Sequence, residues 1–434
     1  MTTELDLQSM YLDYVDDTEP PIVFHRWSFL TGVSALLGRN CYLPFGEGRI
    51  FPNLYTMLVG NPGTRKSSAV KPIKRLLTDL GYQKFAFDRT SKEKFLEDLA
   101  YDGFEGEAPD SNSVMENLFG SSGEEPKQVF ILQDEFNVFI GNGNIEFLSL
   151  LGTLWDWDDE KNCFNQRFKN SKSISIYQPT VTLLGGNTHT GIAQAFPVES
   201  LGQGFMSRML LVFSEPSGKK ITFPKKPPET VRQKLLERME KTVASCHGEF
   251  TVTPKAERAL DSIYRSFKGV DDIRFQHYST RRFTHLLKVC MVVCACSGRL
   301  TIDKDDVVYA NTLLSFIEHY MPKALGEFGK ARNSDVAGKI IAFLSEHKTP
   351  VSDAKIWEKV RTDLDRVEDL GKILAGLGTA NQVQYVNAPN PEHRGWTVIR
   401  KILSEDNMYV DYSLLKEAPE AFKNPVHNVV SFER

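Results

Sequence analysis

The sequence lacks the features of a secreted, membrane-spanning or zinc-binding protein. Only six of its 434 residues are cysteines, and their spacing is not that of a zinc site. Three of the six lie in the apolar run 289–296, where cysteine acts as a small hydrophobic residue. No run of 18 uncharged apolar residues occurs, and the acidic residues 1–17 do not resemble a signal peptide. These absences predict a protein of a reducing cytoplasm with no membrane partner.

The sequence also lacks a strong excess of charge of one sign. Its 52 basic and 56 acidic residues leave a formal net charge of −4. Any contact with nucleic acid must therefore come from a local basic element rather than from the field of the whole chain. The apolar share of 41% and the length are ordinary for a globular protein of two or three domains.

What the sequence does contain is a series of short apolar runs that alternate with helical patterns. The runs 54–59, 129–132, 180–186 and 209–213 have no polar face, as expected for strands that are buried on both sides. The alternation predicts an α/β fold with a parallel sheet.

The same patterns predict the domain organisation. Three helical patterns followed by two short extended runs near the C-terminus are typical of a winged helix-turn-helix. The predicted parts are N-terminal helices (1–50), the sheet-containing core (51–230), an α-helical region (231–332), the winged helix-turn-helix (333–401) and a C-terminal tail (402–434).

The first apolar run leads into a loop that has the length and the end of a Walker A motif. Gly60 and Gly63 allow backbone N–H groups to turn toward phosphate oxygens. Lys66 supplies a charge for the β- and γ-phosphates, and the Ser67 hydroxyl supplies a ligand for Mg²⁺. The loop departs from the usual pattern at Arg65, where a second glycine is expected. The predicted nucleotide-binding residues are Gly60, Asn61, Pro62, Gly63, Thr64, Arg65, Lys66, Ser67 and Ser68.

The second apolar run ends in two acidic residues, Asp134 and Glu135. A carboxylate at the carboxyl end of a strand can hold Mg²⁺ through water, so Asp134 is the predicted metal partner of Ser67. Glu135 is the predicted group that orients or deprotonates the attacking water. An apolar run that ends in Asp-Glu is common by itself, and it gains weight here from the loop that precedes it.

Two further candidates lie at the ends of later runs. Asn187 follows the third run and is predicted to bond the γ-phosphate or the attacking water, although an Asn at a strand end is more often a turn residue. Arg208 precedes the fourth run. A lone arginine is usually a solvated surface charge, but at this position it is predicted to reach the γ-phosphate of a neighbouring subunit, which implies a ring.

Together these residues resemble the AAA+ motors of minichromosome maintenance helicases. In that family the second glycine of the loop is also replaced, the acidic pair precedes Phe as in 134–136, and a Ser-Arg-Phe motif is similar to 207–209. The resemblance implies a P-loop AAA+ core with a helical lid, ATP and Mg²⁺ as cofactors, and self-association into a hexameric ring. It places Arg281 at the sensor position that opens a lid helix, with Arg282 nearly as good a choice.

Residues 21–330 also resemble helicase-like ATPases of phages and prophages, often described as primase-helicases. The large N-terminal primase or zinc module of those proteins has no counterpart here, so primer synthesis is not expected. This resemblance implies movement on single-stranded DNA in a bacterial cell or phage-infected host, with replication proteins as further partners.

The stretch 164–176 alternates basic, polar and apolar residues, as an exposed hairpin would. In the related motors a hairpin at this place carries basic residues into the ring pore, so Arg167, Lys169 and Lys172 are the predicted DNA-binding residues. An ordinary exposed hairpin is the alternative. The third helix of the predicted winged unit is partly acidic, which favours protein contact or gating over DNA contact.

Three functions stay open at this point: a ring helicase or translocase, an ATP-dependent switch that loads or remodels replication proteins, and an ATPase of an anti-phage defence system. The acidic stretch 155–160 is expected to be a solvated loop end, and His277 and His285 are expected to be structural.

Overall fold

The chain forms two compact units, residues 1–326 with 409–434 and residues 327–408. The predicted core and helical region therefore belong to one unit. None of the helices in the described ranges is long and apolar enough to cross a membrane. The computed structural model describes residues 7–101, 103, 125–141, 143–158, 163–167, 173–196, 204–326, 332–347, 349–364, 366–379, 383–390, 394–398 and 409–423.

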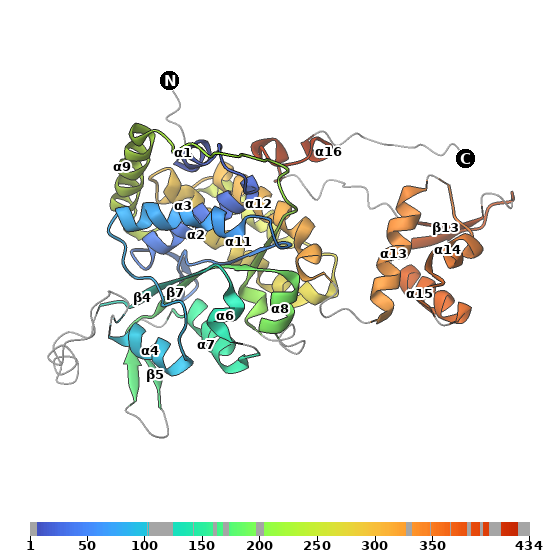
Figure 1. Cartoon of the computed structure of the whole chain (residues 1–434), viewed down its shortest axis with the longest axis horizontal. Helices are drawn as coiled ribbons and strands as arrows, with labels where there is room; N and C mark the ends of the chain where they lie inside the picture. Colours follow the sequence, from blue (N-terminus) through green and yellow to red (C-terminus); the bar gives the residue numbers. More distant parts are fainter. Residues whose placement is uncertain are drawn as a thin grey trace. The chain divides into compact units, whose positions relative to one another are not determined.

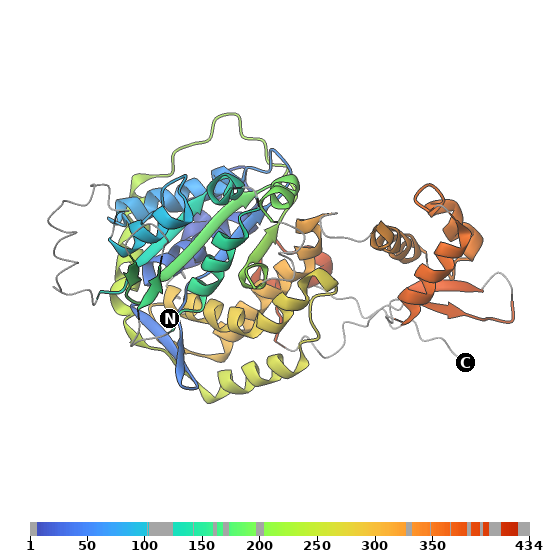
Figure 2. The same ribbon diagram turned by 90° about the horizontal axis from the view of Figure 1, so that it is seen from below.

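The first unit is built on four parallel strands in the order β4-β7-β3-β8, with helices on either side (Figures 1 and 2). This confirms the predicted α/β fold with a parallel sheet. Every residue of β3, β7 and β8 is buried, which explains why these strands read as continuous apolar runs. The strands are β3 (Tyr55–Val59), β4 (Gln128–Gln133), β7 (Thr180–Asn187) and β8 (Leu210–Phe213).

Two neighbouring residues of β3 show how the faces of the sheet are covered. The Tyr55 hydroxyl donates to the carbonyl oxygen of Leu151 in α7 at 2.8 Å. The next side chain, Thr56, accepts a hydrogen bond from Thr31 of α2 at 2.8 Å. Consecutive strand residues point to opposite faces, so α7 and α2 cover opposite faces. The described helices of this unit before residue 327 are α1 (Leu7–Tyr14), α2 (Ile22–Leu37), α3 (Lys66–Asp79), α4 (Lys92–Ala100), α6 (Phe136–Ile140), α7 (Ile145–Trp155), α8 (His189–Ala195), η2 (Met206–Arg208), α9 (Glu229–Ser245), α10 (Pro254–Ser266), η3 (Ile273–Phe275), α11 (Gln276–Cys296) and α12 (Lys304–Leu325).

The prediction that residues 1–50 are helical is wrong for the last part of that segment. Residues 41–50 form an antiparallel hairpin of β1 (Cys41–Phe45) and β2 (Gly48–Ile50). Gly46 occupies its two-residue turn with φ 62°, a conformation that favours glycine. Short strands also interrupt the region predicted to be helical; they are β9 (Gly248–Glu249), which pairs with β1, and the pair β10 (Thr251–Val252) and β11 (Thr301–Ile302).

Part of the predicted C-terminal tail packs on the first unit. Arg26 is buried in α2 and lies 2.7 Å from the Glu417 carboxylate. Asn311 of α12 donates to the carbonyl oxygen of Tyr409 at 2.8 Å. Residues 409–423 are therefore an integral part of this unit; they contain η5 (Tyr412–Leu414) and α16 (Glu420–Lys423).

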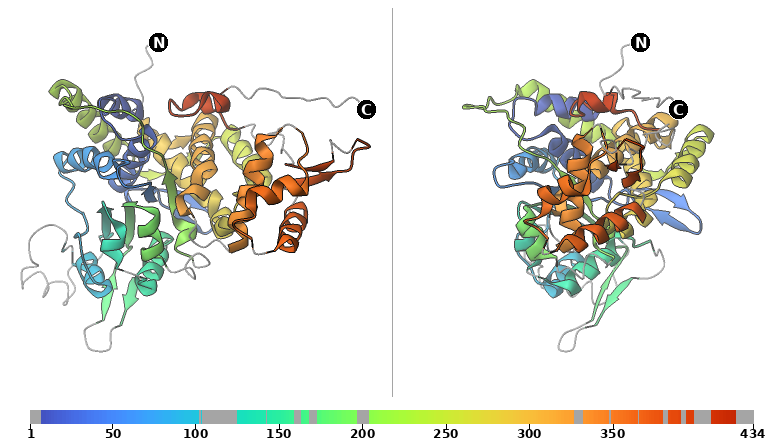
Figure 3. Two further views of the ribbon diagram at one scale, coloured as in Figure 1. Left: turned by 45° about the vertical axis from the view of Figure 1, so that its right-hand side comes forward. Right: turned by 90° about the vertical axis from the view of Figure 1, so that its right-hand side faces the viewer.

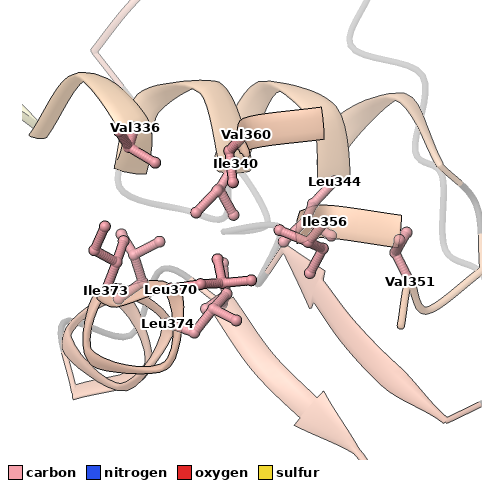
Figure 4. Packing of buried hydrophobic residues seen from close by; sticks show 11 residues of the cluster. Val336, Ile340, Leu344, Val351, Ile356, Val360, Leu370, Ile373 and Leu374 are labelled. Atoms are coloured by element: carbon pink, nitrogen blue, oxygen red, sulfur yellow. The ribbon is translucent and has the colours of Figure 1, made fainter. Parts of the chain in front are cut away.

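In its described ranges the second unit has three helices followed by two antiparallel strands, as predicted from the sequence. Val351 and Trp396 exchange backbone hydrogen bonds at 2.8 and 2.9 Å, which ties the hairpin to the start of the second helix. Aliphatic side chains from every helix fill its core (Figure 4). The elements are α13 (Arg332–Glu346), α14 (Asp353–Val360), α15 (Val367–Thr379), β12 (Val383–Val386) and β13 (Gly395–Val398).

We expect Ile356→Ala to destabilise the second unit selectively. Ile356 is fully buried in this core, and such a truncation costs about 2–5 kcal/mol. Hydrogen–deuterium exchange of the full chain should become faster in α13, α14 and α15 and stay unchanged in β3 and β7. Val367→Ala is the matched control, because the Val367 side chain is 55% exposed. Equal effects of the two substitutions would contradict the described core.

Candidate nucleotide site

Three strand ends meet at the carboxyl edge of the sheet. Val59 of β3 is in register with Asn187 of β7, and Gly185 of β7 is in register with Gln133 of β4. Because the strands are parallel, the loop after β3, the pair 134–135 after β4 and the end of β7 all lie at this edge. The carboxyl edge is where open α/β sheets bind ligands. The fold thus brings together candidates that are far apart in the sequence.

The loop between β3 and α3 is shaped by close backbone packing. A Cβ at Gly60 would lie 2.8 Å from Thr64 Oγ1 and 2.9 Å from the carbonyl oxygen of Ser214. The Thr64 hydroxyl donates to the carbonyl oxygen of Asn61 at 2.9 Å. Gly63 has φ 89°, which a residue with a side chain rarely adopts. The residues that the loop exposes are Asn61, Pro62, Gly63 and Arg65.

Arg65 replaces the usual second glycine and adopts the backbone conformation of a glycine. Its φ of 61° and ψ of 31° are left-handed, a region that costs an L-residue about 1–2 kcal/mol. Arg65 Nε lies 2.7 Å from Glu19 Oε2. The loop therefore keeps a left-handed residue directly before α3. The side chain of that residue is bound by Glu19, which is not part of the loop.

Lys66 is the first residue of α3, and its ammonium group contacts the loop. Lys66 Nζ donates to the carbonyl oxygens of Gly60 and Asn61 at 2.8 and 3.2 Å and to Thr64 Oγ1 at 3.2 Å. Partial burial lowers the pKa of Lys66, and the nearby charge of Glu135 acts in the opposite direction. Charge-assisted bonds to phosphate are stronger than bonds to neutral oxygens, so a bound phosphate would compete for this ammonium group.

The oxygen atoms that the sequence assigns to Mg²⁺ are accessible. Asp134 and Glu135 are exposed, as is Ser68, and Ser67 is half-buried. Within the described ranges, neither carboxylate has a hydrogen-bond or ion-pair partner. A Cβ at Gly186 would lie 2.5 Å from the Asp134 carbonyl oxygen, so glycine permits this close approach of β7.

This donor set fits a magnesium ion. Hydroxyl and carboxylate oxygens are the hard ligands that Mg²⁺ takes, and it commonly uses few protein ligands together with substrate phosphates. The described part of the chain contains no cluster of three or more His, Cys, Asp or Glu side chains able to hold a metal. Ser67 and Asp134 therefore stay the candidate ligands.

Asn187 is buried at the carboxyl edge and has an unused donor. Its Oδ1 accepts the backbone N–H of Thr188 at 3.0 Å. Its Nδ2 atom is buried and has no hydrogen-bond partner among the described residues. This unpaired amide beside the loop is available to a ligand oxygen or to a water molecule.

Arg208 and Arg281 lie away from this edge. Arg208 ends η2, just before the first residue of β8, whereas Val59, which leads into the loop, is paired with Phe213 at the last residue of β8. Arg208 and the loop therefore lie at opposite ends of this strand. Asp156 Oδ2 lies 2.5 Å from Nη2 of Arg208 and 2.8 Å from Nη1 of Arg281. The two predicted arginines are brought together, but not to the other candidates.

The prediction of a solvated loop end at residues 155–160 holds for Asp156, which is exposed at the end of α7, and is wrong for Trp155, which is buried in that helix. Asp156 is nevertheless not without partners. Its carboxylate binds both arginines, and the neighbouring Trp155 ring is buried. Lys288 Nζ lies 4.3 Å from the centre of that ring. Sequence reasoning missed Asp156 because its partners are 52 and 125 residues away.

Arg281 and Arg282 differ in their surroundings. Arg282 is buried, and its Nε donates to Glu318 Oε1 at 2.9 Å. The Arg281 side chain is 35% exposed. Arg281 is therefore the one of the pair that a ligand can reach, and Arg282 packs the helices together.

The predicted hairpin projects from the first unit (Figure 3). β5 (Phe164–Gln166) and β6 (Ile174–Ile176) pair antiparallel, which confirms the predicted hairpin. Arg167 is exposed at the end of β5. Lys169 and Lys172 lie outside the described residues.

No protein-family model and no curated protein matches the chain. The residues of the site are therefore the basis for a functional proposal.

We expect His285 of α11 to make folding sensitive to acid. Burial lowers the pKa of His285 to about 3, and its Nε2 bonds the carbonyl oxygen of Ser207 at 2.9 Å. Because the unfolded chain binds the proton more readily, this stabilising contribution is complete above pH 6.5 and is lost as the pH falls toward 3.

Urea unfolding at pH 6.5 and 4.5 measures this contribution. The wild type should lose about 2–3 kcal/mol more than His285→Phe over this interval. His277→Phe is the control and should follow the wild type, because His277 is exposed on the same helix. The same loss in all three proteins would refute a buried neutral His285.

Proposed function

We propose that this chain is an ATP hydrolase of the P-loop AAA+ type that binds Mg·ATP at the carboxyl edge of its sheet. The observation that carries the proposal is the convergence of the loop 60–67, the pair 134–135 and Asn187 at that edge. Lys66 and the backbone N–H groups of the loop would hold the β- and γ-phosphates, next to the positive end of α3.

Ser67 and Asp134 would hold the Mg²⁺ ion, which when bound neutralises charge on the β- and γ-phosphates. Glu135 is accessible beside them and would orient the attacking water or take its proton. The free Nδ2 atom of Asn187 would donate to the γ-phosphate or to the water. The groups assigned to the ion, the water and the γ-phosphate are thus exposed or lack a protein partner in the described structure.

Arg208 and Arg281 would act on the nucleotide of a second copy. Their position at the amino edge, far from the loop of their own chain, supports action between subunits. Asp156 holds the two guanidinium groups side by side, so they would be presented together. Head-to-tail sites between identical subunits form a ring when the rotation from one subunit to the next closes. The family resemblance suggests such a ring of six subunits.

The ring would move on single-stranded DNA as a helicase or translocase. The projecting hairpin with its exposed Arg167 supports this assignment, as do Lys169 and Lys172, which lie between its two strands in the sequence. Several phosphate contacts would make binding steeply dependent on salt.

A switch that loads or remodels replication proteins is the second candidate. It is favoured by the second unit, which we propose is a winged helix. Its third helix, α15, has Glu368 and Asp369 in its first turn, and its Lys372 is paired with Asp369 at 3.0 Å. This helix is better suited to contact a protein than the DNA backbone.

We expect DNA-stimulated ATP hydrolysis that depends on Arg208. Arg208→Ala should retain ATP binding and lose at least tenfold in turnover, because a positioned arginine stabilises charge in phosphoryl transfer. The measurement is steady-state hydrolysis with and without single-stranded DNA, together with the mass of the assembly. Arg258→Ala, an exposed arginine on α10, is the control and should behave as the wild type.

The outcomes separate the candidate functions. An oligomer, stimulation by DNA and loss of turnover in Arg208→Ala would support the ring motor. Slow hydrolysis that is indifferent to DNA would contradict the helicase and favour the remodelling switch. Full turnover of Arg208→Ala would exclude Arg208 from the reaction.

A further inference from the structure

Two segments outside the sheet lie against the phosphate loop. Residues 15–21 precede α2, and residues 214–228 connect β8 to α9. The connection is longer than most in compact domains, and such connections often have a function. It starts beside the loop, since Ser214 N–H donates to the carbonyl oxygen of Val59 at 3.3 Å. Both segments are therefore placed to influence the loop.

Glu19 joins these two segments to the loop. Its Oε2 lies 2.7 Å from Arg65 Nε, and its Oε1 accepts the backbone N–H of Ile221 at 3.0 Å. Ser217 Oγ donates to the Glu19 carbonyl oxygen. The bond from Ile221 and the charge of Arg65 both lower the pKa of Glu19, so the carboxylate is charged at neutral pH. Both carboxylate oxygens are thus used.

A second contact fixes the two segments to one another. Lys219 Nζ donates to the carbonyl oxygen of Asp16 at 2.9 Å and lies 3.6 Å from its carboxylate. The Lys219 backbone N–H bonds Ser217 Oγ at 3.2 Å. Glu19 is therefore held in place from two directions, whereas Arg65 would otherwise be a free surface side chain: it is 57% exposed, against 21% for Glu19.

We propose that Glu19 is a positioning residue for the phosphate loop. By holding the Arg65 side chain, it keeps residue 65 in the left-handed conformation that directs the following N–H groups and Lys66 toward a triphosphate. It also links this conformation to the position of residues 214–221. The inference rests on the proposed nucleotide site, and it gives Arg65 a role outside direct phosphate contact.

The test is a double-mutant cycle on the full chain with Glu19→Gln, Arg65→Gly and both together. Glu19→Gln keeps the side-chain shape and should weaken Mg·ATP binding about two- to fivefold, the most that an ion pair with a largely exposed arginine contributes. Turnover at saturating ATP should change less than twofold. Arg65→Gly should bind ATP at least as tightly as the wild type, because glycine adopts this conformation unaided.

The decisive result is the effect of Glu19→Gln in the Arg65→Gly background, where we expect none. Glu215→Gln is the matched control, because it removes an exposed carboxylate from the same connection and should leave binding unchanged. Wild-type affinity in Glu19→Gln, or an equal loss in both backgrounds, would overturn the proposal.

Hydrogen exchange of residues 60–66 without nucleotide separates this inference from the proposed function. Glu19→Gln should accelerate exchange only where Arg65 is present. If the wild type binds no ATP but this coupling is found, the proposed function fails and the positioning role stands. If the wild type binds ATP and exchange does not respond to Glu19→Gln, the positioning role fails alone.

Discussion

The parallel register of β4, β7 and β3 is the constraint on which the proposed site depends. The pairs Val59–Asn187 and Gln133–Gly185 fix where each strand ends, and so they deliver the loop, the carboxylates and the amide to one edge. A slip of one residue would turn every side chain to the other face. Glycine at position 186 permits this arrangement, since a Cβ there would lie 2.5 Å from the Asp134 carbonyl oxygen.

The two ends of the parallel strands carry groups that could act on one nucleotide from two copies of the chain. At the carboxyl edge, Lys66 and the loop would hold the phosphates. At the other end, the guanidinium groups of Arg208 and Arg281 share the carboxylate of Asp156. A triphosphate bound to one copy and the paired guanidinium groups of the next copy are of opposite charge, and this attraction is the electrostatic basis of the proposed ring.

The sequence predicted those parts of the molecule that depend on a pattern of neighbouring residues. The parallel sheet, the hairpin at 164–176 and the three helices with two strands near the C-terminus follow from periodicity over a few residues. The sequence did not reveal Asp156 or Glu19, because each acts on arginines that folding alone brings near. The hairpin at 41–50 was missed for a related reason: β1 is stabilised by pairing with β9, more than two hundred residues later. Long-range partners of this kind leave no local pattern.

The most direct test of the account is equilibrium binding of Mg·ATP to the wild type, Lys66→Ala and Glu135→Gln, combined with single-turnover hydrolysis. If the carboxyl edge is the nucleotide site, Lys66→Ala should bind at least tenfold more weakly, because it loses a charge-assisted phosphate contact. Glu135→Gln should bind ATP as the wild type does, and its rate of hydrolysis should fall by a factor of about 100 or more. Unchanged binding by Lys66→Ala, or unchanged hydrolysis by Glu135→Gln, would contradict the assignment of this edge as the site of the reaction.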